Sequence, residues 1–292
     1  MLTLTGLPAL LQASFILVFI SFVAAAGFFF LEMDRVPEDF RLPVRVSIVY
    51  LGIAAISYYY MQAHYGELAA TGERAFPTHF RYIDWILTTP LMLLEFPLIL
   101  GIGKKGRGFM IRLVVLDLFM IIFGYIGELT PQLPAVHYGL FLLGCIAWIL
   151  IIVSLFGALA SLPDGLDETV RRGVRMMGAF VVAGWAIYPL GYFAPLLQAP
   201  PEARELIYNV ADLVNKVGLC LLVYATAKLT AQEREDAEEE YAPYGFEGEV
   251  GGGYQAPPLA ADPAMAEYSD EYRVAGEQVL PSGFNPGLSR NG

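Results

Sequence analysis

Four residues that can hold or pass on a proton share one long apolar stretch. Arg81, Asp84, Thr88 and Glu95 lie between positions 78 and 101, where most other side chains are apolar. A helical residue turns about 100°, so Asp84, Thr88 and Glu95 fall near one stripe, with Arg81 beside them. The two carboxyls are then roughly 16 Å apart along the axis, about half of a hydrocarbon core. This spacing suits a proton path; a soluble buried helix with satisfied polar groups is the alternative.

A second apolar stretch carries a lysine. Asp212 and Lys216 are four residues apart, so they share one helix face. A buried lysine amine is a potential nucleophile for a carbonyl group, with which it forms a Schiff base. Asp84 and Asp212 would then be available as counterions, with Arg81 near them. The alternative is a plain Lys–Asp ion pair that locks two helices together.

Large aromatic side chains accompany these ionisable residues. Trp85 follows Asp84 directly, while Trp185, Tyr188 and Pro189 lie in the apolar stretch that precedes the lysine. Aromatic residues in membrane helices usually serve packing. Beside a buried lysine, these three rings can also form the walls of a flat apolar pocket.

Membrane-spanning helices must position these side chains, because the composition does not suit a soluble domain. Of the 292 residues 56% are hydrophobic and 16% are charged, whereas soluble domains carry about 25% charged residues. Seven apolar segments have the roughly 20 residues that a bilayer requires. Their approximate limits are Leu7–Leu31, Pro43–His64, Thr78–Gly101, Phe109–Gly127, Pro134–Leu159, Val170–Ala194 and Ala203–Leu229. We therefore predict an all-α membrane protein, a bundle of seven transmembrane helices formed by residues 1–229.

The distribution of charge predicts the orientation of the chain. Basic residues concentrate in the first, third and fifth connections, as in the run Gly103–Gly108. By the positive-inside rule these connections are cytoplasmic, so the N-terminus lies outside and the C-terminus inside. Residues 230–292 hold 13 acidic and 3 basic residues, which predicts an acidic, disordered cytoplasmic tail. A partner-binding segment is the alternative for this tail.

Three motifs appear in order on the third, sixth and seventh segments. They are Arg81-Tyr-x-Asp84-Trp85-x-x-Thr88-Thr89-Pro90, Trp185-x-x-Tyr188-Pro189 and Asp212-x-x-x-Lys216-x-Gly218. Residues 7–229 thereby resemble the microbial (type 1) rhodopsins. The resemblance implies a seven-helix bundle with all-trans retinal bound in its centre, as a Schiff base on Lys216. It also implies a multi-pass protein of the cell (inner) membrane, a transporter or photoreceptor and not an enzyme.

The resemblance assigns roles to the residues of the third segment. Asp84, Thr88 and Glu95 are similar to the triplet of proton pumps of the proteorhodopsin and xanthorhodopsin type. Asp84 would be the primary counterion and proton acceptor, Thr88 its hydrogen-bonding helper, and Asp212 the second counterion. Glu95 would be the cytoplasmic proton donor, kept protonated by its dry surroundings, and Arg81 would lie toward the exit.

The resemblance also implies a set of residues around retinal. They are Lys216, Trp85, Thr89, Met92, Met120, Gly124, Phe141, Gly144, Trp185, Tyr188 and Pro189. An apolar Met92 implies the green-absorbing type. Asp117 on the fourth segment is expected to pair with Thr89 across two helices, in a structural role; proton transfer is the alternative.

Two departures from the family pattern change the expectations. Ser57 stands where proteorhodopsins place a histidine against the counterion, and Phe141 stands where a carotenoid antenna requires a glycine. We therefore expect no carotenoid antenna. The expected function is a light-driven outward proton pump in the lipid bilayer, forming a homo-oligomer, with no nucleic-acid partner and no metal. The alternative is a photosensory rhodopsin that signals through a partner, which the long acidic tail favours.

Overall fold

The structure, a computed structural model, describes residues 5–72, 76–101, 106–162 and 166–241. Every regular element in these residues is helical, because a chain surrounded by lipid must satisfy its backbone hydrogen bonds internally. The elements are α1 (Gly6–Glu32), η1 (Met33–Arg35), α2 (Glu38–Thr71), α3 (His79–Ile99), α4 (Arg107–Glu128), α5 (Pro134–Ala160), α6 (Glu168–Trp185), α7 (Ile187–Phe193), η3 (Ala194–Leu197) and α8 (Pro201–Tyr241).

Seven helical stretches among the described residues are long and apolar enough to cross a membrane, which confirms the predicted fold class. The sixth stretch is divided between α6 and α7, which are separated at Ala186. Pro189 explains the division, because it has no N–H to donate to the carbonyl of Trp185 and its ring collides with that carbonyl. Trp185 therefore ends one helix and Tyr188 lies in the first turn of the next.

The ends of several helices follow local signals. α2 stops at Gly72, whose φ of 82° is in the left-handed region that glycine adopts at little cost. α6 starts after Asp167, whose carboxylate accepts hydrogen bonds from the backbone N–H groups of Thr169 and Val170. α8 continues to Tyr241, so the expected boundary at residue 229 lies inside a helix. Residues 242–292 of the expected disordered tail lie outside the described residues.

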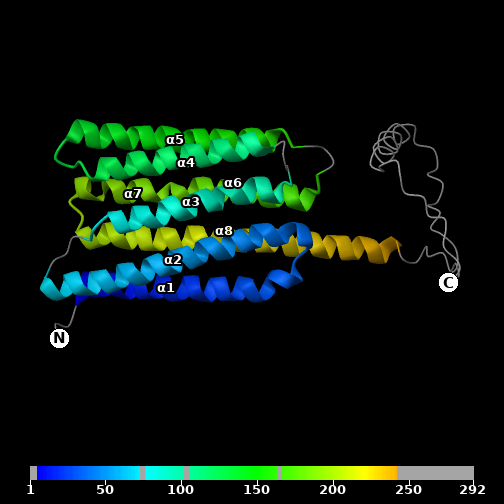
Figure 1. Ribbon diagram of the computed structural model, residues 1–292, viewed down its shortest axis with the longest axis horizontal. Coiled ribbons are helices and arrows are strands. Elements are labelled where there is room, and N and C mark those ends of the chain that lie inside the picture. Colours follow the sequence, from blue (N-terminus) through cyan, green and yellow to red (C-terminus); the bar gives the residue numbers. More distant parts are fainter. Residues whose placement is uncertain (1–4, 73–75, 102–105, 163–165, 242–292) are drawn as a thin grey trace, which may run out of the picture. The chain divides into compact units, whose positions relative to one another are not determined.

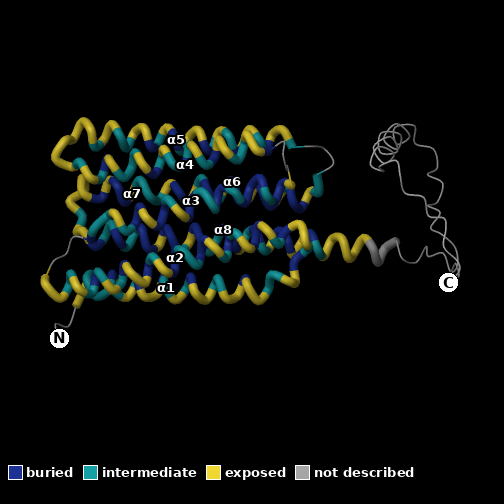
Figure 2. The backbone as a smooth tube through the Cα atoms, in the orientation of Figure 1, coloured by how far each residue is buried: buried dark blue, intermediate teal, exposed yellow. Residues whose placement is uncertain are grey.

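The long helices lie side by side (Figure 1), and their packing closes into a ring. Each helix packs against its neighbour in sequence, and α8 returns to pack on α1, α2 and α6. α3 is the most enclosed of these helices, since 61% of its apolar segment is buried, against 17% for α4. Figure 2 shows the same division: buried residues are concentrated on helices such as α3 and α6, whereas α1 and α5 at the edges of the view are largely exposed. Residues on α3 and α8 are therefore the ones that can meet in the core.

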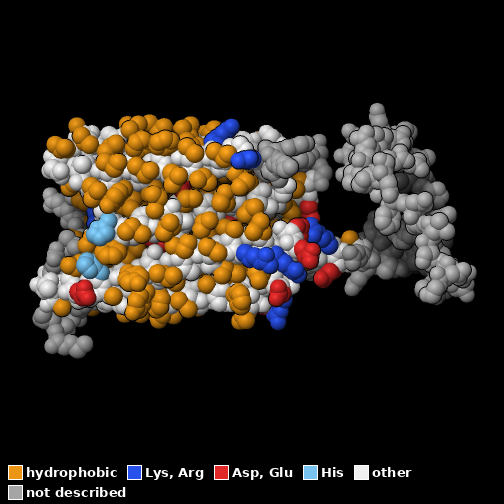
Figure 3. All heavy atoms as spheres, in the orientation of Figure 1, with side chains coloured by type: hydrophobic (Ala, Val, Ile, Leu, Met, Phe, Trp, Pro, Cys, Tyr) orange, Lys and Arg blue, Asp and Glu red, His pale blue; other side chains and the backbone are white. Residues whose placement is uncertain are grey.

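The outer surface is apolar across the middle of the helices (Figure 3). Large side chains such as Ile56 of α2 and Leu142 and Val153 of α5 are at least 60% exposed. Contiguous apolar surface of this extent is what a helix bundle presents to lipid. Most of the Lys and Arg side chains visible in Figure 3 lie toward the end of the bundle from which α8 emerges.

Candidate functional site

The amine of Lys216 lies at the centre of the bundle between two carboxylates. Its Nζ is 2.8 Å from Oδ2 of Asp84 on α3 and 3.1 Å from Oδ1 of Asp212 on α8. All three side chains are at most 1% exposed. Isolated charges at this depth would be very costly, so each side chain depends on its partners to remain charged. The predicted proximity of Lys216 to both aspartates is present.

The two carboxylates have different surroundings. Asp212 accepts hydrogen bonds from Tyr58 (2.8 Å), from the indole of Trp85 (2.9 Å) and from Tyr188 (2.7 Å). Asp84 accepts a hydrogen bond only from Lys216, and its Oδ1 has no hydrogen-bond partner among the described residues. Because hydrogen bonds to a carboxylate stabilise its charged form, the surroundings of Asp212 favour its anion more than those of Asp84 do.

Thr88 was expected to form a hydrogen bond with the carboxylate of Asp84, but its hydroxyl has a different acceptor. Its hydroxyl donates to the main-chain carbonyl of Asp84, 2.9 Å away, and so points back along its own helix. A threonine within a helix commonly donates to the carbonyl four residues earlier, and nothing in the sequence reveals which oxygen it selects. Thr88 is nevertheless fully buried on the same inward stripe as Asp84 and Glu95.

A pocket lies beside the lysine, among α3, α4, α5, α6, α7 and α8. Its walls are mainly aromatic and apolar, and the residues that form them are Tyr82, Trp85, Thr89, Met120, Ile121, Gly124, Phe141, Gly144, Cys145, Trp148, Trp185, Tyr188, Pro189, Tyr192 and Tyr208. Nine of the eleven residues expected around retinal are among them. Met92 and Lys216 are not, although both are buried.

The pocket and the lysine suit the expected chromophore. Trp85 and Tyr188 form part of the pocket wall and also donate to Asp212, so the pocket adjoins the ion pair of Lys216. The rings of Trp85 and Tyr188 meet edge to face, with centroids 5.1 Å apart. A long apolar molecule can occupy such a pocket while one end reaches a buried amine.

A second buried acid supports the pocket wall. Asp117 of α4 accepts a hydrogen bond from Thr89 of α3, with an O–O distance of 2.9 Å. Thr89 itself lines the pocket. The predicted pairing is therefore present and joins two helices that both contribute to the wall.

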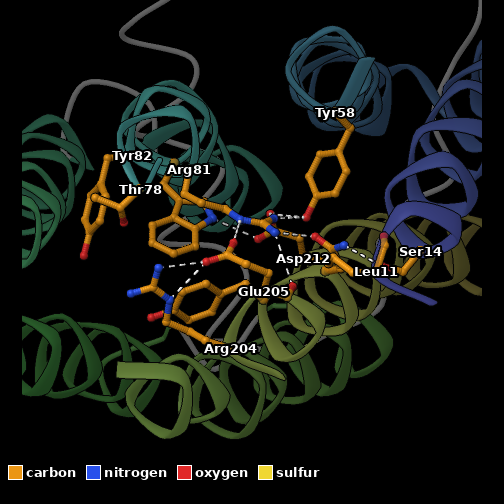
Figure 4. A network of polar contacts seen from close by, with 12 residues as sticks. Leu11, Ser14, Tyr58, Thr78, Arg81, Tyr82, Arg204, Glu205 and Asp212 are labelled. Atoms are coloured by element: carbon orange, nitrogen blue, oxygen red, sulfur yellow. Dashed lines mark hydrogen bonds and ion pairs between the residues drawn. The ribbon is translucent and has the colours of Figure 1, made fainter. Parts of the chain in front are cut away.

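Arg81 connects the ion pair to a group of polar residues near the start of α8 (Figure 4). Its guanidinium donates to Tyr58 (2.7 Å), to the carboxylate of Glu205 (3.0 Å) and to Asn209. It is also 3.8 Å from Asp212. Aromatic rings surround the buried cation, with the nearest, Phe15, 5.1 Å from the guanidinium carbon.

The same network continues to a further acid at the end of α4. Arg204 lies 3.0 Å from Glu205 and 3.8 Å from Glu128. Glu128 also accepts hydrogen bonds from Thr78, Tyr82 and Tyr208, the last two at 3.3 Å. Polar contacts thus run without a break from Lys216 to the end of the bundle where α8 begins.

Glu95 lies on the opposite side of the lysine, toward the other end of the bundle. It is fully buried, and one of its oxygens accepts a hydrogen bond from Ser47 of α2. Leu93 and Phe96 beside it are buried as well. The predicted dry environment is present, and a neutral carboxyl suits it better than a charged one.

Several residues of the site are not among those predicted from the sequence. Tyr58 is one of three adjacent tyrosines, so its identity alone does not distinguish it. Tyr50, Tyr58 and Tyr65 are spaced by eight and seven residues, about two helical turns, and this periodicity could have identified the inward face of α2. Ser47 lies on this face too. Glu128 offered no such signal, since its partners Tyr82 and Tyr208 come from other helices, α3 and α8.

Comparisons with known proteins agree with this geometry. A sequence model of the family described as bacteriorhodopsin-like protein matches residues 9–230. The chain is 38% identical, over 221 residues, to a green-light absorbing proteorhodopsin of Gamma-proteobacterium EBAC31A08; the match covers 73% of this chain and 85% of the relative.

Solved structures show the same fold. Exiguobacterium sibiricum rhodopsin superposes with a TM-score of 0.69 at 36% identity, over 77% of this chain and 98% of its own. Xanthorhodopsin, described as a light-driven ion pump with dual chromophore, superposes with a TM-score of 0.71 at 28% identity, over 79% and 96% of the two chains.

Proposed function

The chain belongs to the bacteriorhodopsin-like family of retinal-binding membrane proteins, and we propose that it is a light-driven outward proton pump. The observation that carries the proposal is the placement of three acids about one buried amine. Asp84 and Asp212 contact Lys216, while Glu95 is buried on the same stripe of α3 toward the opposite end of the bundle. One carboxyl can therefore receive the proton of the lysine nitrogen, and another can replace it from the other side.

Retinal, joined to the Lys216 amine, would supply the absorption of light and the change of shape that starts the cycle. Trp85, Trp185 and Tyr188 would enclose it, because they line the pocket beside the lysine. The nitrogen lies within hydrogen-bonding distance of Asp84. Asp84 takes the proton in preference to Asp212, since three other side chains stabilise the charge of Asp212.

The exit lies on the side of Arg81. A positive guanidinium between Asp212 and Glu205 favours the charged form of both acids and thus hinders return of the proton. Arg204 and Glu128 extend the chain of polar contacts toward the end of the bundle. A proton released from Asp84 therefore has a continuous polar path on this side.

Glu95 restores the proton of the lysine nitrogen. Its carboxyl is neutral in a dry environment and can donate once the nitrogen has lost its proton. Ser47 contacts one of its oxygens and orients it. Transport is vectorial because the acceptor and the proton donor lie on opposite sides of the lysine.

The direction of transport follows from the distribution of basic residues. Arg35, Arg41, Arg107, Arg171 and Arg172 lie at the end of the bundle that carries the connections after α1, α3 and α5. The positive-inside rule makes this end cytoplasmic. Glu95 then faces the cytoplasm and Arg81 the outside, so protons leave the cell.

A pH measurement on illuminated cells tests the proposal. Cells that contain the protein and retinal should acidify an unbuffered medium in light, and a protonophore should abolish the signal. Lys216→Ala should remove both the visible absorption band and the acidification, because no other described lysine is buried in the centre of the bundle.

The same cells distinguish a pump from a photosensor. Glu95→Gln should leave the colour nearly unchanged but slow the return of the proton to the lysine nitrogen by about a hundredfold or more, as expected for loss of a positioned acid. Transient absorption after a laser flash measures this step. A wild type that binds retinal but causes no pH change, together with an unaltered cycle in Glu95→Gln, would establish the photosensory alternative.

A further inference from the structure

Tyr50 of α2 lies fully buried between the proposed proton donor and the lysine. It is three residues after Ser47, so both side chains project from one face of α2 toward α3 and α8. Ser47 contacts the Glu95 carboxyl on α3. Tyr50 reaches α8, where its hydroxyl donates to the main-chain carbonyl of Lys216 with an O–O distance of 3.2 Å.

The phenol of Tyr50 has a second potential acceptor. Ser47, one turn earlier on the same buried face of α2, contacts the Glu95 carboxyl, so that carboxyl lies next to the face from which Tyr50 projects. Oε2 of Glu95, the oxygen that Ser47 does not contact, accepts no hydrogen bond among the described residues. One hydroxyl proton can therefore be directed either to the backbone of α8 or to the carboxyl of α3.

The charge of Glu95 decides between these two acceptors. While Glu95 is neutral, the carbonyl of Lys216 is a suitable acceptor. Once Glu95 has given up its proton, its carboxylate becomes the stronger acceptor, because hydrogen bonds to an ionised group are roughly twice as strong as those between neutral groups. An unpaired carboxylate at this depth would also be costly.

We infer that Tyr50 is a switchable hydrogen-bond donor that turns from the Lys216 carbonyl to the Glu95 carboxylate and so speeds proton transfer to the lysine nitrogen. The inference rests on the proposed role of Glu95. The transferred proton leaves a Glu95 oxygen and arrives at the nitrogen, while Tyr50 keeps its own O–H bond and changes only its acceptor. Tyr50 is thus a positioning residue that lowers the cost of the charge on Glu95.

Tyr50→Phe tests the inference, because it removes the hydroxyl and keeps the buried ring. Loss of one hydrogen bond to a charged group should slow return of the proton to the lysine nitrogen by about tenfold to a hundredfold. The absorption maximum should change little, since the Tyr50 hydroxyl donates to the main-chain carbonyl of Lys216, whereas Asp84 and Asp212 contact its side-chain amine. Tyr224→Phe is the matched control, because it removes a hydroxyl that donates to a different acid, Glu32, on the same side of the bundle.

A double variant separates this inference from the proposed function. In the Glu95→Gln background, Tyr50→Phe should cause no further slowing, because the carboxylate that the hydroxyl stabilises is gone. If Glu95→Gln slows the step and Tyr50→Phe alone does not, the inference is overturned while the pump proposal stands. If Glu95→Gln has no effect, the proposed function fails first.

Infrared spectroscopy of the wild type tests the inference without a substitution of Tyr50. With ring-labelled tyrosine, a C–O band of one tyrosine should shift at the moment when the Glu95 carboxyl band disappears. The shift should be absent in Glu95→Gln and unaffected in Tyr224→Phe. Loss of the Glu95 band without any tyrosine shift would overturn the inference, even if Tyr50→Phe failed to fold.

Discussion

At the scale of single residues, two chemically identical carboxylates of the site differ in the number of hydrogen bonds that they accept. Asp84 and Asp212 both contact Lys216, yet only Asp212 has three further hydrogen-bond donors. This difference supports the proposal that Asp84 accepts the proton while Asp212 remains charged. The role of a buried aspartate therefore depends less on its residue type than on the number of hydrogen-bond donors around its carboxylate.

Phe141 leads to a prediction about antenna pigments. Its ring lines the pocket and stacks on Tyr192, with centroids 4.1 Å apart. A carotenoid lying against this side of the pocket would need the space that the two rings occupy. Hydroxylated carotenoids added to the protein should therefore transfer no excitation energy to retinal, as measured by an excitation spectrum.

Phe141→Gly supplies the comparison for this experiment. Removing the ring opens the wall, so a variant that gains carotenoid bands would locate the obstruction at this residue. Carotenoid bands in the wild type would contradict the prediction and would mean that the ring moves aside.

At the scale of elements, the close approach of α6 to α8 is what brings Trp185 toward the lysine helix. Asn215, next to Lys216, donates to the carbonyl of Gly184 (3.0 Å) and to that of Ala211 (2.8 Å). A Cβ atom at Gly184 would lie 1.8 Å from Oδ1 of Asn215. Any larger residue at position 184 would therefore force the Asn215 side chain to move.

Gly184→Ala should therefore destabilise the pigment. The methyl group displaces the Asn215 side chain from its hydrogen bonds, at a cost of about 1–3 kcal/mol for overpacking. The rate of thermal bleaching of the visible band measures the effect. Gly27→Ala is the control, because a Cβ at Gly27 of α1 meets no atom within 4 Å.

A second substitution determines whether the contact causes this loss. Combining Gly184→Ala with Asn215→Ala relieves the collision, so the double variant should lose less stability than the two single effects added together. Additive losses would show that the contact between Gly184 and Asn215 is not responsible.

At the scale of the whole molecule, the helical ring separates an ionisable interior from an apolar exterior. Arg81, Asp84, Glu95, Asp212 and Lys216 are all at most 1% exposed. The outward faces carry large apolar side chains over the middle of the helices (Figure 3). Closure of the ring by packing of α8 on α1 is what keeps lipid away from these charges.

The proposed proton path is contained within the ring, which predicts the effect of removing the tail. All residues assigned to the path lie between Ser47 and Lys216, whereas residues 242–292 follow the last described helix. A chain that ends at Tyr241 should bind retinal and acidify the medium as the full chain does. The measurement is light-driven acidification per amount of pigment; its loss, with the visible band retained, would implicate the tail in transport.

Local pattern determined much of this protein. The lengths of the apolar segments predicted seven membrane-spanning helices. Helical periodicity predicted that Asp84, Thr88 and Glu95 share one buried stripe of α3, and the four-residue spacing predicted that Asp212 lies beside Lys216. These features depend only on the geometry of a single helix, which the order of residues sets.

Only the tertiary structure decided which side chains meet across helices. In the folded bundle the hydroxyl of Thr88 donates to a backbone carbonyl. Of three adjacent tyrosines, Tyr58 is the one that donates to Asp212. Glu128 accepts a hydrogen bond from Tyr208. The tertiary structure also placed Tyr50 against the backbone of Lys216, 166 residues away. Such contacts depend on the rotation and axial offset of each helix against its neighbours, and these are set by packing of the whole bundle, which no single segment encodes.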